Sequence, residues 1–154
     1  MQNLLVRDCR REDLSAILKI EKESFPDPWG RELLEKELSL SFSRFIVAEV
    51  DGEVVGYLIA WIVGDSCELN RIAVAPCMRR RGIGRKLLYE LMDYCKNRNV
   101  KEIFLEVRES NLNAIKLYES SGFEKISVRK NYYGGESAFI YRFKLDRGGE
   151  DAQG

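Results

Sequence analysis

A basic, glycine-containing loop joins an apolar strand to a helix in the segment Ile72-Ala73-Val74-Ala75-Pro76-Cys77-Met78-Arg79-Arg80-Arg81-Gly82-Ile83-Gly84-Arg85-Lys86. The strand is predicted from Cys67 to Val74, and Pro76 ends it. The helix is predicted from about Ile83 to Arg98, with one apolar stripe. The stripe contains Ile83, Leu87, Leu88, Leu91, Met92 and Cys95. Lys101 to Arg108 is again an apolar strand, so the segment predicts a strand-helix-strand crossover between parallel strands.

The elements around this crossover alternate between strand and helix patterns. Before it we predict a strand over Leu4 to Arg7, a helix over Asp13 to Phe25 capped by Asp13, and a helix over Arg31 to Leu40. Two strands follow, over Arg44 to Val50 and Glu53 to Val63, and a type I′ turn at Asp51-Gly52 joins them. After it we predict a helix capped by Asn111 or Asn113 and ended by Gly122, then strands over Phe123 to Lys130 and Ser137 to Leu145 across Tyr132-Tyr133-Gly134-Gly135. This order predicts an α/β fold with a mixed, mostly antiparallel sheet and flanking helices.

The length of the chain predicts one domain. With 154 residues, 45% of them apolar, it can bury a core of its own. We place this domain at residues 1–145, because residues 146–154 are polar and glycine-rich and predict a frayed tail. No internal repeat or linker interrupts it.

The composition narrows the classes of function. Lysine and arginine balance aspartate and glutamate, so net charge favours neither sequence-specific nucleic acid nor an anionic membrane as partner. No apolar run reaches the roughly 20 residues that span a bilayer, and we expect a cytoplasmic protein. The four scattered cysteines predict reduced, mostly buried thiols and no disulfide framework. The absence of histidine excludes Ser-His-Asp and Cys-His nucleophile systems and histidine zinc sites, and we expect no metal.

The loop predicts a pyrophosphate site. Six basic residues and no acidic residue lie between positions 71 and 86, namely Arg71, Arg79, Arg80, Arg81, Arg85 and Lys86. Gly82 and Gly84 let backbone N–H groups approach an anion where the helix dipole is positive. A solvated basic turn is the alternative reading. The segment matches neither a Walker loop nor the dinucleotide fingerprint Gly-x-Gly-x-x-Gly, because Gly84 precedes Arg85-Lys86-Leu87.

These residues resemble a known family. The run from Ile72 to Pro76, followed by Arg79-x-x-Gly82-x-Gly84, looks like the acetyl-CoA motif of the GNAT superfamily of N-acetyltransferases. The resemblance covers nearly the whole chain. The runs Leu105-Glu106-Val107-Arg108-Glu109-Ser110-Asn111 and Ala114-Ile115-x-Leu117-Tyr118-Glu119 are most similar to those of ribosomal-protein alanine N-acetyltransferases and archaeal protein N-terminal acetyltransferases.

The resemblance implies acetyl-CoA as cosubstrate and assigns residues to it. The backbone of Ile72, Ala73 and Val74 would pair with the pantetheine arm, and Asn111 matches a position that contacts the cofactor in relatives. The pyrophosphate would be held by Arg79, Arg80, Arg81, Gly82, Ile83, Gly84 and Arg85. The sequence departs from many relatives at Cys77-Met78, which affects the expected packing of the loop.

Acetyl transfer needs a neutral amine and a protonated leaving thiolate. Glu106 lies in an apolar strand, on the face opposite Leu105 and Val107, where burial makes a carboxylate a stronger base. A solvent-facing glutamate and a buried structural tyrosine are the alternative readings of Glu106 and Tyr118. The resemblance implies the catalytic base at Glu106 and the proton donor at Tyr118. Cys77 has no histidine to activate it, so we expect direct transfer without a covalent intermediate.

The resemblance implies a protein N-terminus, that of a ribosomal protein with alanine first, as acceptor. The run Phe25-Pro26-Asp27-Pro28-Trp29 is closer to the bacterial members, and Tyr132 and Tyr133 are predicted to form an aromatic wall for the peptide or to be plain hairpin residues. A polyamine or amino acid as acceptor, and a CoA-binding sensor without turnover, are the alternatives. The sequence leaves the oligomeric state open.

Overall fold

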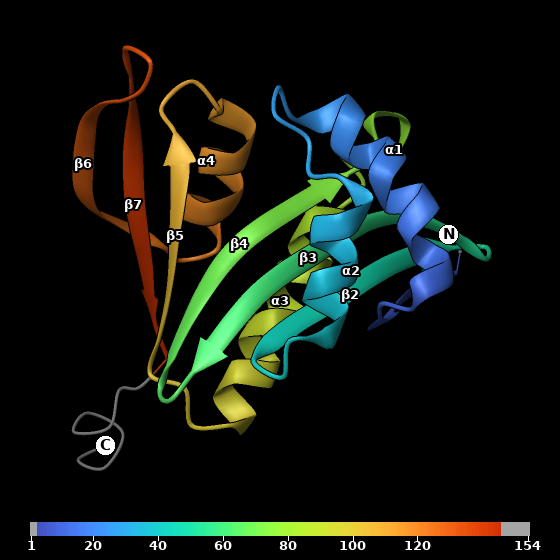
Figure 1. The fold of residues 1–154 in the computed structure, drawn as a ribbon. Coiled ribbons are helices and arrows are strands. Elements are labelled where there is room, and N and C mark those ends of the chain that lie inside the picture. Colours follow the sequence, from blue (N-terminus) through green and yellow to red (C-terminus); the bar gives the residue numbers. More distant parts are fainter. Residues whose placement is uncertain (1–2, 146–154) are drawn as a thin grey trace. The chain divides into compact units, whose positions relative to one another are not determined.

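The computed structural model describes residues 3–145, and every helix and strand predicted above is present among them (Figure 1). The elements are β1 (Leu4–Asp8), the 3-10 helix η1 (Arg11–Asp13), α1 (Leu14–Ser24), α2 (Arg31–Ser39), β2 (Ser43–Val50), β3 (Glu53–Val63), β4 (Ser66–Val74), the 3-10 helix η2 (Pro76–Met78), α3 (Ile83–Asn97), β5 (Glu102–Arg108), α4 (Leu112–Ser120), β6 (Glu124–Tyr133) and β7 (Glu136–Lys144). The two 3-10 helices were not predicted.

The strands of the described residues form one sheet in the order β1-β2-β3-β4-β5-β7-β6. β1 with β2, β2 with β3, β5 with β7, and β6 with β7 are antiparallel pairs. β4 and β5 pair in parallel, and α3 is the connection between them. The predicted mixed sheet, mostly antiparallel with one parallel crossover, is therefore confirmed.

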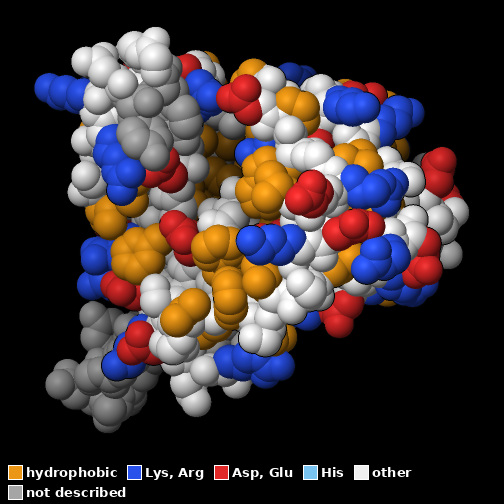
Figure 2. Space-filling model, in the orientation of Figure 1, with side chains coloured by type: hydrophobic (Ala, Val, Ile, Leu, Met, Phe, Trp, Pro, Cys, Tyr) orange, Lys and Arg blue, Asp and Glu red, His pale blue; other side chains and the backbone are white. Residues whose placement is uncertain are grey.

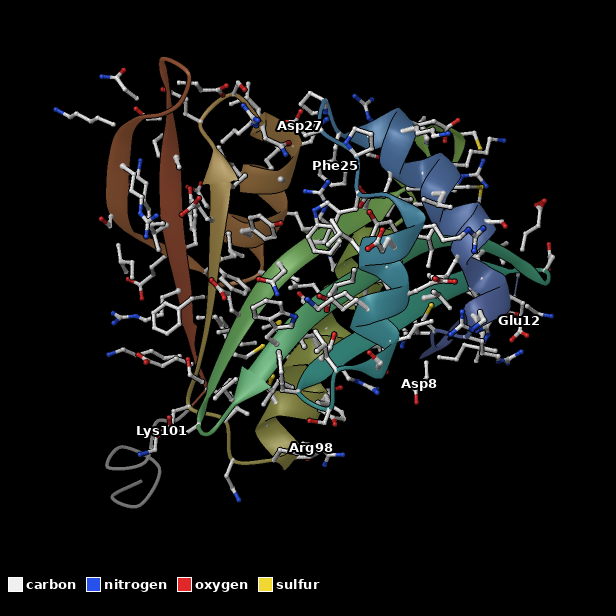
Figure 3. The ribbon with its side chains drawn as sticks, in the orientation of Figure 1. Asp8, Glu12, Phe25, Asp27, Arg98 and Lys101 are labelled. Carbon is white, nitrogen blue, oxygen red and sulfur yellow. The ribbon has the colours of Figure 1, made fainter. Side chains whose placement is uncertain are left out.

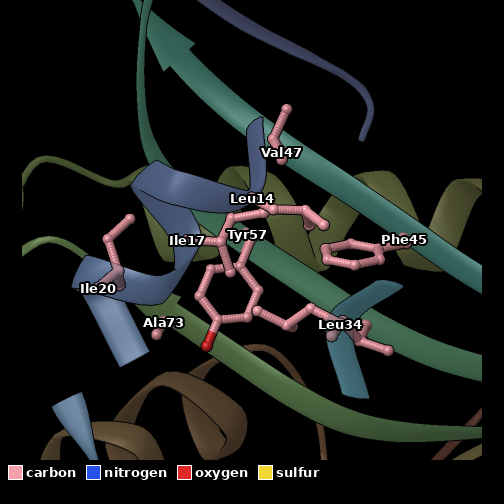
Figure 4. Packing of buried hydrophobic residues seen from close by; sticks show 9 residues of the cluster. Leu14, Ile17, Ile20, Leu34, Phe45, Val47, Tyr57 and Ala73 are labelled. Carbon is pink, nitrogen blue, oxygen red and sulfur yellow. The ribbon is translucent and has the colours of Figure 1, made fainter. Parts of the chain in front are cut away.

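The chain divides into two compact units, which hold residues 3–61 and 70–91 and residues 62–69 and 92–145. In the first unit, α1 and α2 cover one face of the sheet (Figure 1). Alternate residues of β2 and β3 meet these helices in a buried cluster (Figure 4). The cluster contains Leu14, Ile17, Ile20, Leu34, Phe45, Val47, Tyr57, Ile59 and Ala73.

Within the first unit, the other face of the sheet packs against the start of α3. Gly56 of β3 permits the close approach, because a Cβ there would lie 3.1 Å from the carbonyl oxygen of Ala73 and 3.4 Å from side-chain atoms of Ile83 and Leu87. Helix α3 is thereby held against the strand that leads into the basic loop.

The second unit builds its core from β5, β7 and α4. Burial alternates strictly along β5, with Ile103, Leu105 and Val107 buried. Tyr118 of α4 packs against the rings of Phe123 and Tyr141, with centroid distances of 5.8 and 6.3 Å. These aromatic contacts fix α4 to β7 within this unit.

Two turns and one cap test the predicted local chemistry. The two-residue turn at Asp51-Gly52 is confirmed, with φ values of 51° and 85°. The connection between the last two strands was predicted too long. Strand β6 continues to Tyr133, and Gly134-Gly135 alone form the turn, with φ values of 57° and 101°. The expected cap of α1 by Asp13 was also wrong, because its carboxylate accepts hydrogen bonds from the backbone N–H of Arg10 and from Arg7 instead.

Charges of both signs alternate over the face of the molecule in Figure 2, as the zero net charge leads one to expect. No helix in residues 3–145 is both long and apolar enough to cross a membrane. The tail predicted at residues 146–154 lies outside the described residues.

Candidate active site

The basic loop of the first unit has the backbone geometry of an anion site. Arg80 and Gly82 adopt positive φ values of 65° and 80°, which turn the chain sharply into α3. At the start of α3, the N–H of Lys86 donates to the carbonyl of Gly82, the residue before the helix, at 3.0 Å. The N–H groups of Ile83, Gly84 and Arg85 therefore have no acceptor within the helix and can bind phosphate oxygens.

The side chains of the loop are less uniform than the sequence predicts. The guanidinium of Arg79 donates to the carbonyl of Val74 at 2.9 Å and to the hydroxyl of Ser24 at 3.1 Å, so it closes the loop onto β4 and α1. Arg71 pairs with Glu21 at 2.8 Å, although the sequence counts it among the six basic residues of the site. Lys86 pairs with Glu90. Arg80 and Arg81 are exposed on the loop, and Arg85 is half-buried.

Strand β4 carries the segment predicted to meet the pantetheine arm. Its ladder with β5 covers Ser66–Leu69 and ends there, before Ile72. On its β3 side the chain is fixed up to Ala75, whose N–H donates to the carbonyl of Val55 at 2.8 Å. The main-chain groups of residues 72–74 that point away from β3 are thus not used by the ladder with β5, and an extended amide-bearing ligand can pair with them.

Glu106 lies in the second unit, on β5. As predicted, it faces away from Leu105 and Val107, but its burial is only partial, with 27% of the side chain exposed. Its carboxylate lies 3.4 Å from the guanidinium of Arg129 on β6. Glu106 therefore reaches solvent while held in place by a cation.

Tyr118 lies in the same unit, on the opposite face of β5. It is 5% exposed, and its ring contacts Tyr141, the residue paired with Leu105 in the ladder. Burial raises the pKa of the Tyr118 hydroxyl above its usual value, so the hydroxyl stays protonated and can donate a proton. Glu106 and Tyr118 thus flank β5 from its two faces.

Asn111 is the N-cap of α4, since its side-chain oxygen accepts from the N–H of Ala114 at 3.3 Å. This agrees with one of the two predicted caps and leaves the side-chain amide N–H groups for other partners. The backbone of Tyr132 and Tyr133 ends β6, but their side chains lie outside the described part of the chain.

A buried polar cluster around Glu21 in the first unit was not predicted from the sequence. Glu21 is 0% exposed, and its carboxylate accepts hydrogen bonds from Tyr57, Trp29 and Arg71. A signal for it existed: Glu21 follows Ile17 by four residues and falls on the apolar stripe of α1. A carboxylate in that position needs a buried cation or several donors.

Three comparisons place the chain among known proteins. The acetyltransferase (GNAT) family matches residues 14–123. The [ribosomal protein bS18]-alanine N-acetyltransferase of Escherichia coli K12 is 37% identical over 132 residues, covering 83% of this chain and 88% of that protein. The N-alpha-acetyltransferase of Sulfurisphaera tokodaii is 36% identical over 149 residues, covering 88% and 89%.

Solved structures agree in fold. The crystal structure of the ribosomal-protein-S18-alanine N-acetyltransferase from Escherichia coli has a TM-score of 0.88 and 33% identity, covering 97% of this chain and 98% of that one. The PaiA N-acetyltransferase from Thermoplasma acidophilum, solved in complex with coenzyme A, has a TM-score of 0.78 and 21% identity, covering 92% and 99%. The second likeness concerns the fold alone.

Proposed function

The chain belongs to the GNAT acetyltransferase family and is an acetyltransferase, and from this premise we propose that it transfers the acetyl group of acetyl-CoA to the N-terminal α-amino group of a protein. A ribosomal protein with alanine at its N-terminus is the proposed acceptor, because the relative from Escherichia coli bears that name. The relative from Sulfurisphaera tokodaii is likewise named for α-amino groups.

The proposed binding of acetyl-CoA is supported mainly by a continuous series of main-chain groups in the first unit. The groups of residues 72–74 outside the β4–β5 ladder would pair with the pantetheine amides. The N–H groups at the start of α3, with Arg80, Arg81 and Arg85 nearby, would hold the pyrophosphate. Backbone donors suit both tasks, because they are fixed before the ligand arrives.

The second unit supplies the proposed proton transfers. An α-amino group has a pKa of roughly 7.7–8.0, so a carboxylate that reaches solvent can take its proton directly or through one water. Glu106 would take that proton. The neutral amine nitrogen then bonds to the thioester carbon, and the carbon–sulfur bond breaks as Tyr118 would give its proton to the departing thiolate. The nitrogen loses its second proton to water, and Tyr118 takes a proton back from water.

The test is mass spectrometry of acetyl transfer to a mixed pool of acceptors. The pool contains peptides with free N-terminal Ala, Ser or Met, N-blocked lysine peptides, and spermidine. We expect acetyl groups on α-amines, with the alanine peptide acetylated fastest. Transfer to spermidine alone would replace the proposal with a small-amine enzyme, and CoA binding without transfer would replace it with a sensor.

Glu106→Gln tests the base, and Glu102→Gln is its matched control. Both glutamates lie on the same face of β5, and both pair with an arginine, at 3.4 Å for Glu106 and 3.6 Å for Glu102. We expect Glu106→Gln to lower kcat on the order of 100-fold or more, the usual contribution of a general base, and Glu102→Gln to leave it near wild type. Equal losses in the two variants would mean that Glu106 is only an ion-pair partner.

A further inference from the structure

A buried ion pair between Glu21 of α1 and Arg71 of β4 also holds the loop that joins α1 to α2, through hydrogen bonds to Trp29 and Asp27. Glu21 is completely buried, and its carboxylate receives the Tyr57 hydroxyl, the Trp29 N–H at 2.7 Å, and the Nε and Nη2 groups of Arg71 at 3.0 and 2.8 Å. A buried carboxylate strongly destabilises the fold unless its oxygens are all paired. Here four donors satisfy it, so the arrangement is strongly specified.

Arg71 extends this attachment across the loop. Its guanidinium lies over the rings of Phe25 and Trp29, with its central carbon 3.8 and 4.9 Å from their centroids. It also donates to the carbonyl of Asp27 at 3.1 Å. Phe25 and Asp27 lie in the connection between α1 and α2 (Figure 3). One side chain of β4 therefore contacts alternate residues of the loop, through both its charge and its flat faces.

The position of Arg71 in the chain gives this attachment a consequence for the reaction. Arg71 directly precedes residues 72–74, and the loop proposed to hold the pyrophosphate follows them. An arm that starts at the pyrophosphate and runs back along β4 brings its thioester end to the neighbourhood of Arg71. The acceptor amine must arrive at that same end.

We propose that Arg71 and Glu21 are positioning residues, which hold the α1–α2 loop in register with the part of β4 that carries the thioester. The proposal rests on the proposed function, since it places the thioester at the Arg71 end of the strand. Glu21 has a second effect: it neutralises Arg71 where an acceptor arrives that is cationic until it loses a proton. An unpaired guanidinium there would repel it.

The kinetic test compares Arg71→Gln and Arg71→Lys with Arg7→Gln. Arg7 is the matched control, because it also joins a partly buried network of the first unit and donates to Asp13 and Glu49 at 2.6 to 3.0 Å. These partners lie outside the loop of residues 25–30. We expect Arg71→Gln to lower kcat/KM for the peptide on the order of 10- to 100-fold, mainly through KM, with little change in the Kd of CoA. Arg71→Lys keeps the charge but loses the planar guanidinium, so its kcat/KM for the peptide should lie between those of the wild type and Arg71→Gln.

A second readout does not depend on activity. Amide exchange of residues 25–30 reports few amides, because Pro26 and Pro28 carry none. We expect the Trp29 amide to exchange about tenfold faster or more in Arg71→Gln and at the wild-type rate in Arg7→Gln, as follows when a buried charge pair is broken. Should Arg71→Gln fail to fold, the peptide kinetics and the Trp29 amide exchange are measured on Arg71→Lys instead.

The outcomes separate the two proposals. Suppose that Arg71→Gln and Arg7→Gln lower the melting temperature by similar amounts, while the KM for the peptide and the Trp29 amide exchange stay at wild-type values. Arg71 is then a stabilising residue only, and the positioning proposal is overturned. If the wild-type protein acetylates no α-amine but Arg71→Gln still releases the Trp29 amide, the proposed acceptor fails while the attachment of the loop by Arg71 stands.

Discussion

At the scale of single residues, Tyr118 has a structural and a proposed chemical role that substitution can separate. Its ring packs against Phe123 and Tyr141, whereas its hydroxyl is the proposed proton donor to the thiolate. Desolvation keeps the hydroxyl protonated, because burial raises its pKa. The two roles belong to different atoms, so removing the oxygen alone isolates the chemistry.

Tyr118→Phe is expected to lower kcat about 100-fold or more, because the thiolate must then take its proton from water, while the melting temperature changes little. Steady-state kinetics and thermal melts measure the two effects. Tyr141→Phe is the control: it removes a hydroxyl of the same aromatic cluster, which donates to Glu119 at 2.7 Å. A similar kcat in both variants would leave Tyr118 as a packing residue.

At the scale of elements, the turn from the basic loop into α3 decides where the backbone donors point. Gly82 has a φ of 80°, and nothing lies within 4 Å of the place a Cβ would occupy, so an alanine there meets backbone strain but no clash. Gly52, in the turn between β2 and β3, has a φ of 85° and the same open surroundings. The two glycines form a matched pair for testing.

We expect Gly82→Ala and Gly52→Ala to destabilise the fold equally, by about 1–2 kcal/mol. Only Gly82→Ala should weaken CoA binding, on the order of tenfold, because relaxing φ at position 82 tilts the first amides of α3 away from the phosphates. Thermal melts and calorimetric titration with CoA check both expectations. Unchanged CoA affinity in Gly82→Ala would argue against a pyrophosphate at this helix start.

At the scale of the whole molecule, the absence of histidine shapes the dependence of stability on pH. No side chain with an ordinary pKa between 5 and 8 is present, so stability should be nearly flat over that range. At lower pH, Asp13 matters, since hydrogen bonds from Arg7 lower its pKa below the usual value. A group whose pKa is lower in the folded state stabilises the fold above its unfolded pKa, and this stabilisation is lost as pH falls through the folded value.

The melting temperature should therefore stay level from pH 8 to about 5 and fall below about pH 4, where unfolded aspartate takes up protons. Asp13→Asn should melt lower at pH 7 and lose less on acidification, because it has no carboxylate to protonate. Melts of both proteins from pH 2.5 to 8 test this. Parallel curves for the two proteins would show that Asp13 makes no such contribution.

The order and type of the helices and strands followed from the sequence alone, because periodicity, turn residues and the parallel crossover are local or short-range patterns. The type I′ turn at Asp51-Gly52 needs only two residues that tolerate positive φ. The basic loop before α3 was likewise visible, since its glycines and arginines are contiguous. The predicted roles of Glu106 and Tyr118 came from family resemblance and stay predictions.

What only the tertiary structure decided is how the charged side chains are used. Arg71 and Arg79 looked like part of a phosphate site, but one pairs with Glu21, 50 positions away, and the other donates to Val74 and Ser24. Asp13 looked like a cap and instead pairs with Arg7. Hydrophobic pattern depends on neighbours a few residues apart, whereas the partner of a charge is chosen by whichever opposite charge or donor the fold brings within about 3 Å.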